Sequence, residues 1–107
     1  LLIAAGEFGR TPKGTRQKGT ATGKLHWGRD HWPGAQSILI SGGGFRMGQV
    51  IGATDKHAAF PVERPVDPQD LMATIYKHLG IDLATHFPDL SGRPVAITTG
   101  TPIKELG

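Results

Sequence analysis

Residues 67–80 constrain the fold most, because every local signal in this segment favours one amphipathic helix. Asp67 is a good N-cap and Pro68 a good first helical residue. Gly80 supplies a stop after the last turn. Large apolar residues recur at four-residue spacing between these signals, at Leu71, Ile75 and Leu79. The pattern predicts a helix over 68–79 whose apolar stripe belongs to the core.

Short apolar runs elsewhere predict strands. Leu1–Ala5 is bounded by Gly6, and Gln36–Ser41 ends in the triple glycine 42–44. A further short run over 47–52 follows these glycines, which predicts a small Gly-rich antiparallel hairpin. Later in the chain the sequence predicts one more short strand and a terminal helical turn, at 95–97 and 102–106.

The bulk properties limit the class of protein. The 107 residues suffice for one small domain, and the absence of cysteine excludes disulfides and thiolate metal sites. No apolar run approaches the roughly 18 residues that a membrane span needs. A core strand that begins at Leu1 predicts that 1–107 is one partial domain, the C-terminal part of a longer domain whose N-terminal remainder is a partner.

Glu7 and Arg10 follow the first predicted strand directly. In open α/β sheets, ligands bind at the carboxyl ends of the strands, so both residues are candidates for a site. The simpler alternative is that Glu7 forms an ion pair with Arg10 or another cation of the loop.

Residues 28–33 place a cation, a carboxylate, an imidazole and an indole between a glycine and a proline, which favours a loop. Asp30 and His31 together form a plausible metal-ligand or acid–base pair. Arg29 beside them is a candidate anion contact. The alternative is a surface Asp-His pair without a role, and Trp32 either walls the site or packs against the helix.

The segment 10–29 contains half of the twelve Lys and Arg residues and no Asp or Glu. This composition predicts a basic, flexible loop that favours an anionic partner. Nucleic acid is the weaker expectation, because the segment shows neither aromatic interleaving nor a strand or helix register that would present the cations.

Several motifs in order resemble one bacterial family, the DUF1501 family, which is abundant in planctomycetes. The resemblance covers nearly the whole chain and rests on these segments: Gly-Glu-Phe-Gly-Arg-Thr-Pro (6–12), Gly-Arg-Asp-His-Trp-Pro (28–33), Gly-Gly-Gly (42–44), Gly-Gln-Val-Ile-Gly-Ala-Thr-Asp-Lys (48–56), Arg-Pro-Val (64–66), Ala-Thr-Ile-Tyr (73–76), Leu-Gly-Ile-Asp (79–82) and Gly-Arg-Pro-Val (92–95). That family is similar in turn to the alkaline phosphatase and sulfatase superfamily. The resemblance implies an α/β fold of three layers with a mostly parallel sheet.

The resemblance also implies a metal-dependent hydrolase of phosphate or sulfate esters, with zinc, calcium or magnesium as the divalent ion. His31, Asp30 and Glu7 are then the candidate ligands, and Arg10 and Arg29 the candidate anion contacts. Phe8 stands where the superfamily has a metal-binding histidine, and the nucleophile of the superfamily lies in the N-terminal remainder.

Two functions follow as alternatives. The first is hydrolysis of a small anionic ester or a sulfated glycan. The second is a domain of the same fold that binds an anion or glycan without catalysis. The family resemblance further implies an exported protein.

Overall fold

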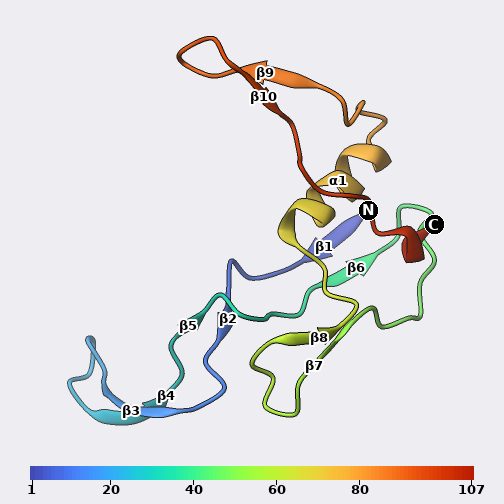
Figure 1. Cartoon of the computed structure of the whole chain (residues 1–107). Coiled ribbons are helices and arrows are strands. Elements are labelled where there is room, and N and C mark those ends of the chain that lie inside the picture. The colour runs from blue at the N-terminus through green and yellow to red at the C-terminus, as the bar shows by residue number, and fades with distance from the viewer. The chain divides into compact units, whose positions relative to one another are not determined.

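The computed structural model describes all residues 1–107 (Figure 1). The chain divides into two compact units, each made of two segments. The first consists of Leu1–Ser41 and Gly52–Pro65, and the second of Gly42–Ile51 and Val66–Gly107. Every strand pairs with one partner only, in an antiparallel two-stranded ladder.

The first unit holds four of these ladders. They are β1 (Leu2–Ala4) with β6 (Leu39–Ser41), β2 (Gly9–Arg10) with β5 (His31–Trp32), β3 (Thr15–Lys18) with β4 (Leu25–Gly28), and β7 (Ala53–Thr54) with β8 (Pro61–Glu63).

The strands expected at Leu1–Ala5 and Gln36–Ser41 are confirmed as β1 and β6, and they pair with each other. The expectation that the first is a core strand is wrong, because it pairs on one edge only and Leu1 and Leu2 are 45% and 57% exposed. The hairpin expected across residues 42–44 is wrong, because 47–51 form no strand. All three glycines have left-handed φ angles, whereas a two-residue type I′ hairpin turn needs only two such residues. The apolar β1 takes the ladder position that the hairpin would have filled. The mostly parallel sheet stays a prediction.

The segment 10–29 is also more regular than expected. β3 and β4 pair over four residues each and give the cations of this segment a defined strand register. The expectation that no register presents them is therefore wrong. β3 (Thr-Arg-Gln-Lys) contains no apolar residue, and the two apolar residues of β4, Leu25 and Trp27, form too short an alternation to reveal the ladder.

The second unit contains α1 (Pro68–His78), β9 (His86–Pro88), β10 (Pro94–Ala96) and a terminal 3-10 turn over Lys104–Leu106. The predicted helix, the last strand and the terminal turn are confirmed. Asp67 caps α1 by accepting from the Gln69 N–H, and Asp70 completes a capping box by accepting from the Asp67 N–H. None of the helices is long and apolar enough to cross a membrane.

The buried face of α1 differs from the predicted stripe. Leu79 is 63% exposed, whereas Ala73 is fully buried and Thr74 is 5% exposed. The reason lies in the C-terminal segment, which runs along the helix backbone: Thr98 Oγ1 donates to the Gln69 carbonyl, and a Cβ at Gly100 would overlap that peptide. Small residues allow this close approach, and long leucines would not.

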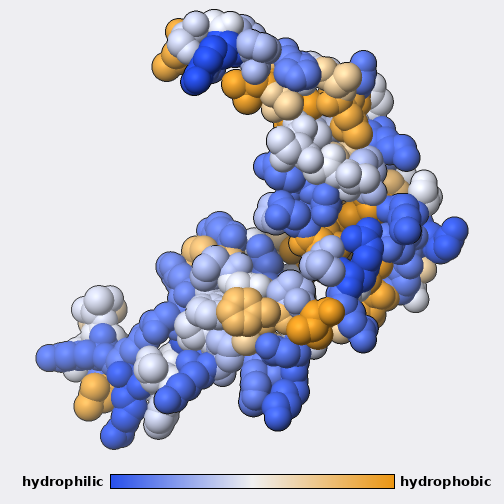
Figure 2. Space-filling view, viewed as in Figure 1, coloured by the Kyte–Doolittle hydropathy of each residue, from blue (hydrophilic) through white to orange (hydrophobic).

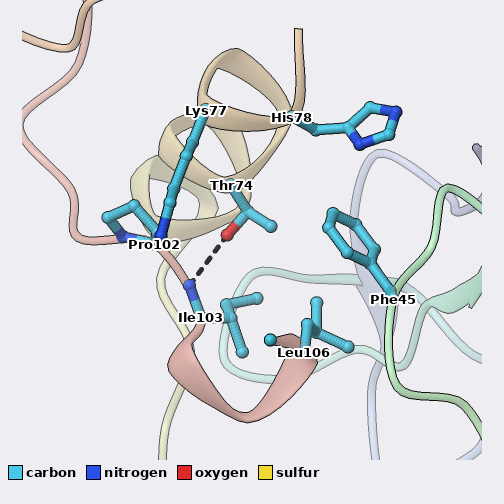
Figure 3. Close-up of a pocket in the computed structure, with 8 residues that line it drawn as sticks. Phe45, Thr74, Lys77, His78, Pro102, Ile103 and Leu106 are labelled. Atoms are coloured by element: carbon cyan, nitrogen blue, oxygen red, sulfur yellow. Dashed lines mark hydrogen bonds between the residues drawn. The ribbon is translucent and has the colours of Figure 1, made fainter. Parts of the chain in front are cut away.

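Thr74 joins the helix to this segment. Its hydroxyl donates to the Asp70 carbonyl at 2.7 Å and accepts from the Ile103 N–H at 2.9 Å. Figure 3 shows this bond beside a small depression of about 140 Å³, which Phe45 and Leu106 also line. Ile103 and Leu106 are buried, so the small core of the second unit lies between α1 and the terminal turn.

Candidate functional site

The β2–β5 ladder brings the two predicted site segments together. Arg10 lies opposite His31 and Gly9 opposite Trp32. The ladder extends through Thr11, whose N–H donates to the Asp30 carbonyl and whose hydroxyl accepts from the Asp30 N–H, both at 2.9 Å. Gly9 is required here, since a Cβ would overlap the Ala35 carbonyl. Residues about twenty positions apart in the sequence therefore share one short ribbon.

Phe8 covers the imidazole of His31. The two rings stack with centroids 3.7 Å apart and an interplanar angle of 27°. The Arg10 guanidinium carbon lies 5.7 Å from the centroid of the same phenyl ring. At the position where the superfamily has a metal-binding histidine, Phe8 thus contacts both a guanidinium and an imidazole.

Arg10 and Arg29 are tied to each other through the backbone. Arg10 Nη1 donates to the Arg29 carbonyl at 3.1 Å. No carboxylate lies within ion-pair distance of either guanidinium, so the Glu7–Arg10 pair considered above is not formed. Each guanidinium carries five N–H donors, and the single bond to a carbonyl uses only one of those on Arg10.

Both arginines line a shallow concavity of about 320 Å³ in the first unit. Its walls come from the segment between β1 and β2, from β2, from residue 29 between β4 and β5, from residues 35–37 after β5, and from β7 with the turn that follows it. They include Gly6, Phe8, Arg10, Arg29, Ser37 and Thr54. The residues that line the concavity thus include two cationic and two hydroxyl-bearing ones, a composition that suits an anionic ligand.

Trp32 fixes the opposite side of the ribbon. Its indole N–H donates to the Ala59 carbonyl at 2.7 Å, and its ring lies 5.4 Å from that of Phe60. Of the two alternatives for this residue, packing is therefore the one observed, although the contact is with the β7–β8 turn and not with the helix. Trp32 anchors that turn to the ribbon.

Asp55 organises the same turn and was missed as a site residue. Its Oδ1 accepts from the backbone N–H groups of His57 and Ala59, at 3.0 and 2.9 Å. These two hydrogen bonds lower the pKa of Asp55 from its ordinary value of 3.8, and the bond from the Ala59 N–H has the larger effect. They enclose Ala58, whose φ of 55° is left-handed, and Ala58 lines the concavity with Thr54.

The signal for Asp55 was present in the sequence. An aspartate at the start of a turn commonly accepts hydrogen bonds from the next backbone N–H groups. Thr54 and Lys56 beside it suggested only a polar connection, because no single residue type reveals that the turn returns to the site.

The candidate metal ligands do not form a group of three. His31 is exposed and stacked on Phe8, Asp30 Oδ1 accepts from the Gln17 side-chain amide, and Glu7 is exposed. Across the chain no three His, Asp or Glu side chains gather in a way that could hold a metal ion. These residues do not supply a complete metal site among themselves. The other four histidines are also exposed: His26, His57, His78 and His86.

Among known proteins, the chain matches one family model. No curated protein and no solved structure matches it. The profile of one family, described as a protein of unknown function (DUF1501), matches residues 1–106. Because this match spans almost every residue, the chain belongs to the DUF1501 family.

Proposed function

We propose that this part of the protein forms the anion-binding portion of a hydrolase of phosphate or sulfate esters. The observation that carries the proposal is that Arg10 and Arg29 both line one concavity and that neither has a carboxylate within ion-pair distance. The resemblance to the alkaline phosphatase and sulfatase superfamily supports the reaction class. The fold of that superfamily, with three layers and a mostly parallel sheet, is part of the same proposal.

The chemistry of the two arginines suits a tetrahedral oxyanion. A guanidinium presents a planar fork of donors that matches two oxygens of phosphate or sulfate. The bond from Arg10 to the Arg29 carbonyl restricts the first side chain and positions the backbone of the second. Ser37 and Thr54 provide hydroxyl groups for the remaining polar atoms of the ligand.

A divalent metal is proposed on the resemblance alone. His31, Asp30 and Glu7 are the candidate ligands, but they do not gather into one group, so no reaction step is derived through a metal here. Metal analysis of the purified intact protein and of His31→Ala tests the assignment. We expect the metal content to fall in the variant, and equal content in both proteins would remove His31 from the ligand set.

The alternative function is binding of an anion or glycan without hydrolysis. Phe8 favours this alternative, because its ring stacks on the His31 imidazole at the position where the superfamily has a metal ligand.

An ester-hydrolysis screen with aryl phosphates and aryl sulfates on the intact protein separates the two functions. We expect turnover by the wild type and a raised KM in Arg29→Gln, with little change in Lys24→Gln as the control for lost charge in the same segment. Loss of turnover in Glu7→Gln would show that this carboxylate takes part. Anion binding without turnover of any ester would favour the second function.

A further inference from the structure

The β3–β4 ladder has two different faces. Directly paired residues lie on the same face of a ribbon, and so do residues two positions apart on one strand. Arg16 pairs with Trp27 and Lys18 with Leu25. One face, which we call the basic–aromatic face, therefore consists of Arg16, Lys18, Leu25 and Trp27.

The other face is occupied by contacts within the ribbon. Gln17 donates to Thr15 and to Asp30, and a Cβ on Gly28 would touch the Gln17 amide. On the basic–aromatic face, Gly14 lies next to the indole of Trp27, since a Cβ there would be in ordinary contact with the indole Cε3 atom at 3.7 Å. Hydrogen bonds of Gln17, to Thr15 in the ribbon and to Asp30 beside it, thus hold the polar face, and the other face is left to solvent.

The basic–aromatic face is strongly exposed. Trp27 is 71% and Leu25 is 67% exposed, and Arg16 and Lys18 are exposed beside them. Figure 1 shows β3 and β4 side by side, joined by their turn, and Figure 2 shows this end of the first unit as mostly hydrophilic with a small hydrophobic interruption. The segment from 10 to 29 contains no Asp or Glu, so this face is cationic and favours a negatively charged partner.

The apolar residues decide which kind of anionic partner fits. A soluble polyanion satisfies the cations and stacks a ring or sugar on Trp27, but it offers nothing to the aliphatic side chain of Leu25. An anionic bilayer provides a partner for both kinds of side chain: phosphates for Arg16 and Lys18, and acyl chains beneath the phosphates for Leu25. Tryptophan prefers this boundary, because its ring is apolar and its N–H needs a polar partner.

We propose that the basic–aromatic face of the β3–β4 ribbon binds peripherally to the surface of a bilayer that contains anionic lipid. The long cationic side chains extend to the phosphates, while Leu25 and Trp27 enter the headgroup region. This contact is distinct from a membrane span, and it does not depend on the ester-binding function proposed above.

Co-sedimentation of the intact protein with vesicles tests the proposal. The vesicles contain phosphatidylcholine alone or phosphatidylcholine with phosphatidylglycerol, and the variants are Trp27→Ala and the double variant Arg16→Gln/Lys18→Gln. The control double variant Lys56→Gln/Lys104→Gln removes the same charge elsewhere. All these side chains are exposed, so the fold is expected to tolerate the changes, which circular dichroism checks.

We expect the wild type to bind the anionic vesicles in a salt-sensitive way. The affinity should be at least about tenfold lower in Arg16→Gln/Lys18→Gln, while the control double variant stays close to wild type. Brominated lipids should quench tryptophan emission in the wild type and much less in Trp27→Phe. Absence of binding by the wild type, or equal binding by all variants, would overturn the proposal. Binding to a single-stranded oligonucleotide or to heparin but not to vesicles would assign the face to a soluble polyanion instead.

Discussion

The phenyl ring of Phe8 lies on the imidazole of His31, with ring centroids 3.7 Å apart and nearly parallel planes. The two residues belong to separate segments that the β2–β5 ladder joins. Phe8 stands where the superfamily has a metal-binding histidine, and its ring lies against both the His31 imidazole and the Arg10 guanidinium.

The Phe8–His31 contact should make the effects of mutating the two residues on the free energy of unfolding non-additive. We expect a double-mutant cycle of Phe8→Leu and His31→Gln to give about 0.5–1.5 kcal/mol of coupling, the range for stacked aromatic pairs. Urea unfolding of the intact protein measures it. The same cycle with His26→Gln should give none, because His26 lies on the other ladder, and coupling near zero for Phe8 with His31 would show that the stack contributes nothing.

Asp55 predicts a pH dependence of stability. Its folded-state pKa is lowered below the ordinary value of 3.8, chiefly by the Ala59 N–H. Ionised Asp55 therefore stabilises the folded state above about pH 4, and this contribution is lost as the pH falls through the lowered pKa. We expect wild type to be more stable than Asp55→Asn at neutral pH, with a difference that shrinks below about pH 4. A difference that stays constant with pH would contradict the assignment.

Two substitutions of Thr74 distinguish the effect of losing a hydrogen bond from the effect of losing side-chain volume. Thr74→Val keeps the shape of the side chain but removes the acceptor of the Ile103 N–H, which should cost about 1–3 kcal/mol of unfolding free energy. Thr74→Ser keeps the hydroxyl and loses one methyl, so we expect a cost of about 1 kcal/mol. Denaturant unfolding compares the two variants, and an equal or smaller cost for the valine would mean that the bond is not important.

The Asp67 cap predicts a third stability difference. Asp67→Ala removes the acceptor of the Gln69 N–H and should destabilise the protein by about 1 kcal/mol. Asp67→Ser retains an acceptor oxygen at the N-cap, so its effect should be clearly smaller. The helical signal in circular dichroism, followed through thermal unfolding, checks both, and identical midpoints for the two variants would contradict the role of the cap.

The sequence predicted the elements whose signals are local. The helix over 68–78 carries its own cap, first-turn proline and C-terminal glycine, so its existence and bounds followed directly. Its buried face did not follow, because residues 98–106 decide which side of the helix is covered. Backbone contacts from about thirty positions away select Ala73 and Thr74 over the larger leucines.

In the candidate site, too, features with a local sequence signal were predicted and features that depend on distant segments were not. Arg10 was predicted from its place after the first strand, and Arg29 and His31 from residue type and from the glycine and proline around them. The ladder pairs Arg10 with His31, and a hydrogen bond joins Arg10 to the Arg29 carbonyl. The stacking of Phe8 and the turn held by Asp55 could not be predicted in this way. Two-residue strands carry too short a pattern to reveal their pairing, and both features depend on pairing between distant segments.

The central claim is that Arg10 and Arg29 form one anion-binding site. Isothermal titration of the intact protein with inorganic phosphate and with sulfate tests it most directly, using Arg10→Gln and, as the charge control, Lys24→Gln, an exposed cation of the same segment that does not line the concavity. A charged hydrogen bond lost at the site should weaken binding about tenfold or more in Arg10→Gln, while Lys24→Gln stays close to wild type. Equal affinity in Arg10→Gln and wild type, or equal losses in both variants, would contradict the site.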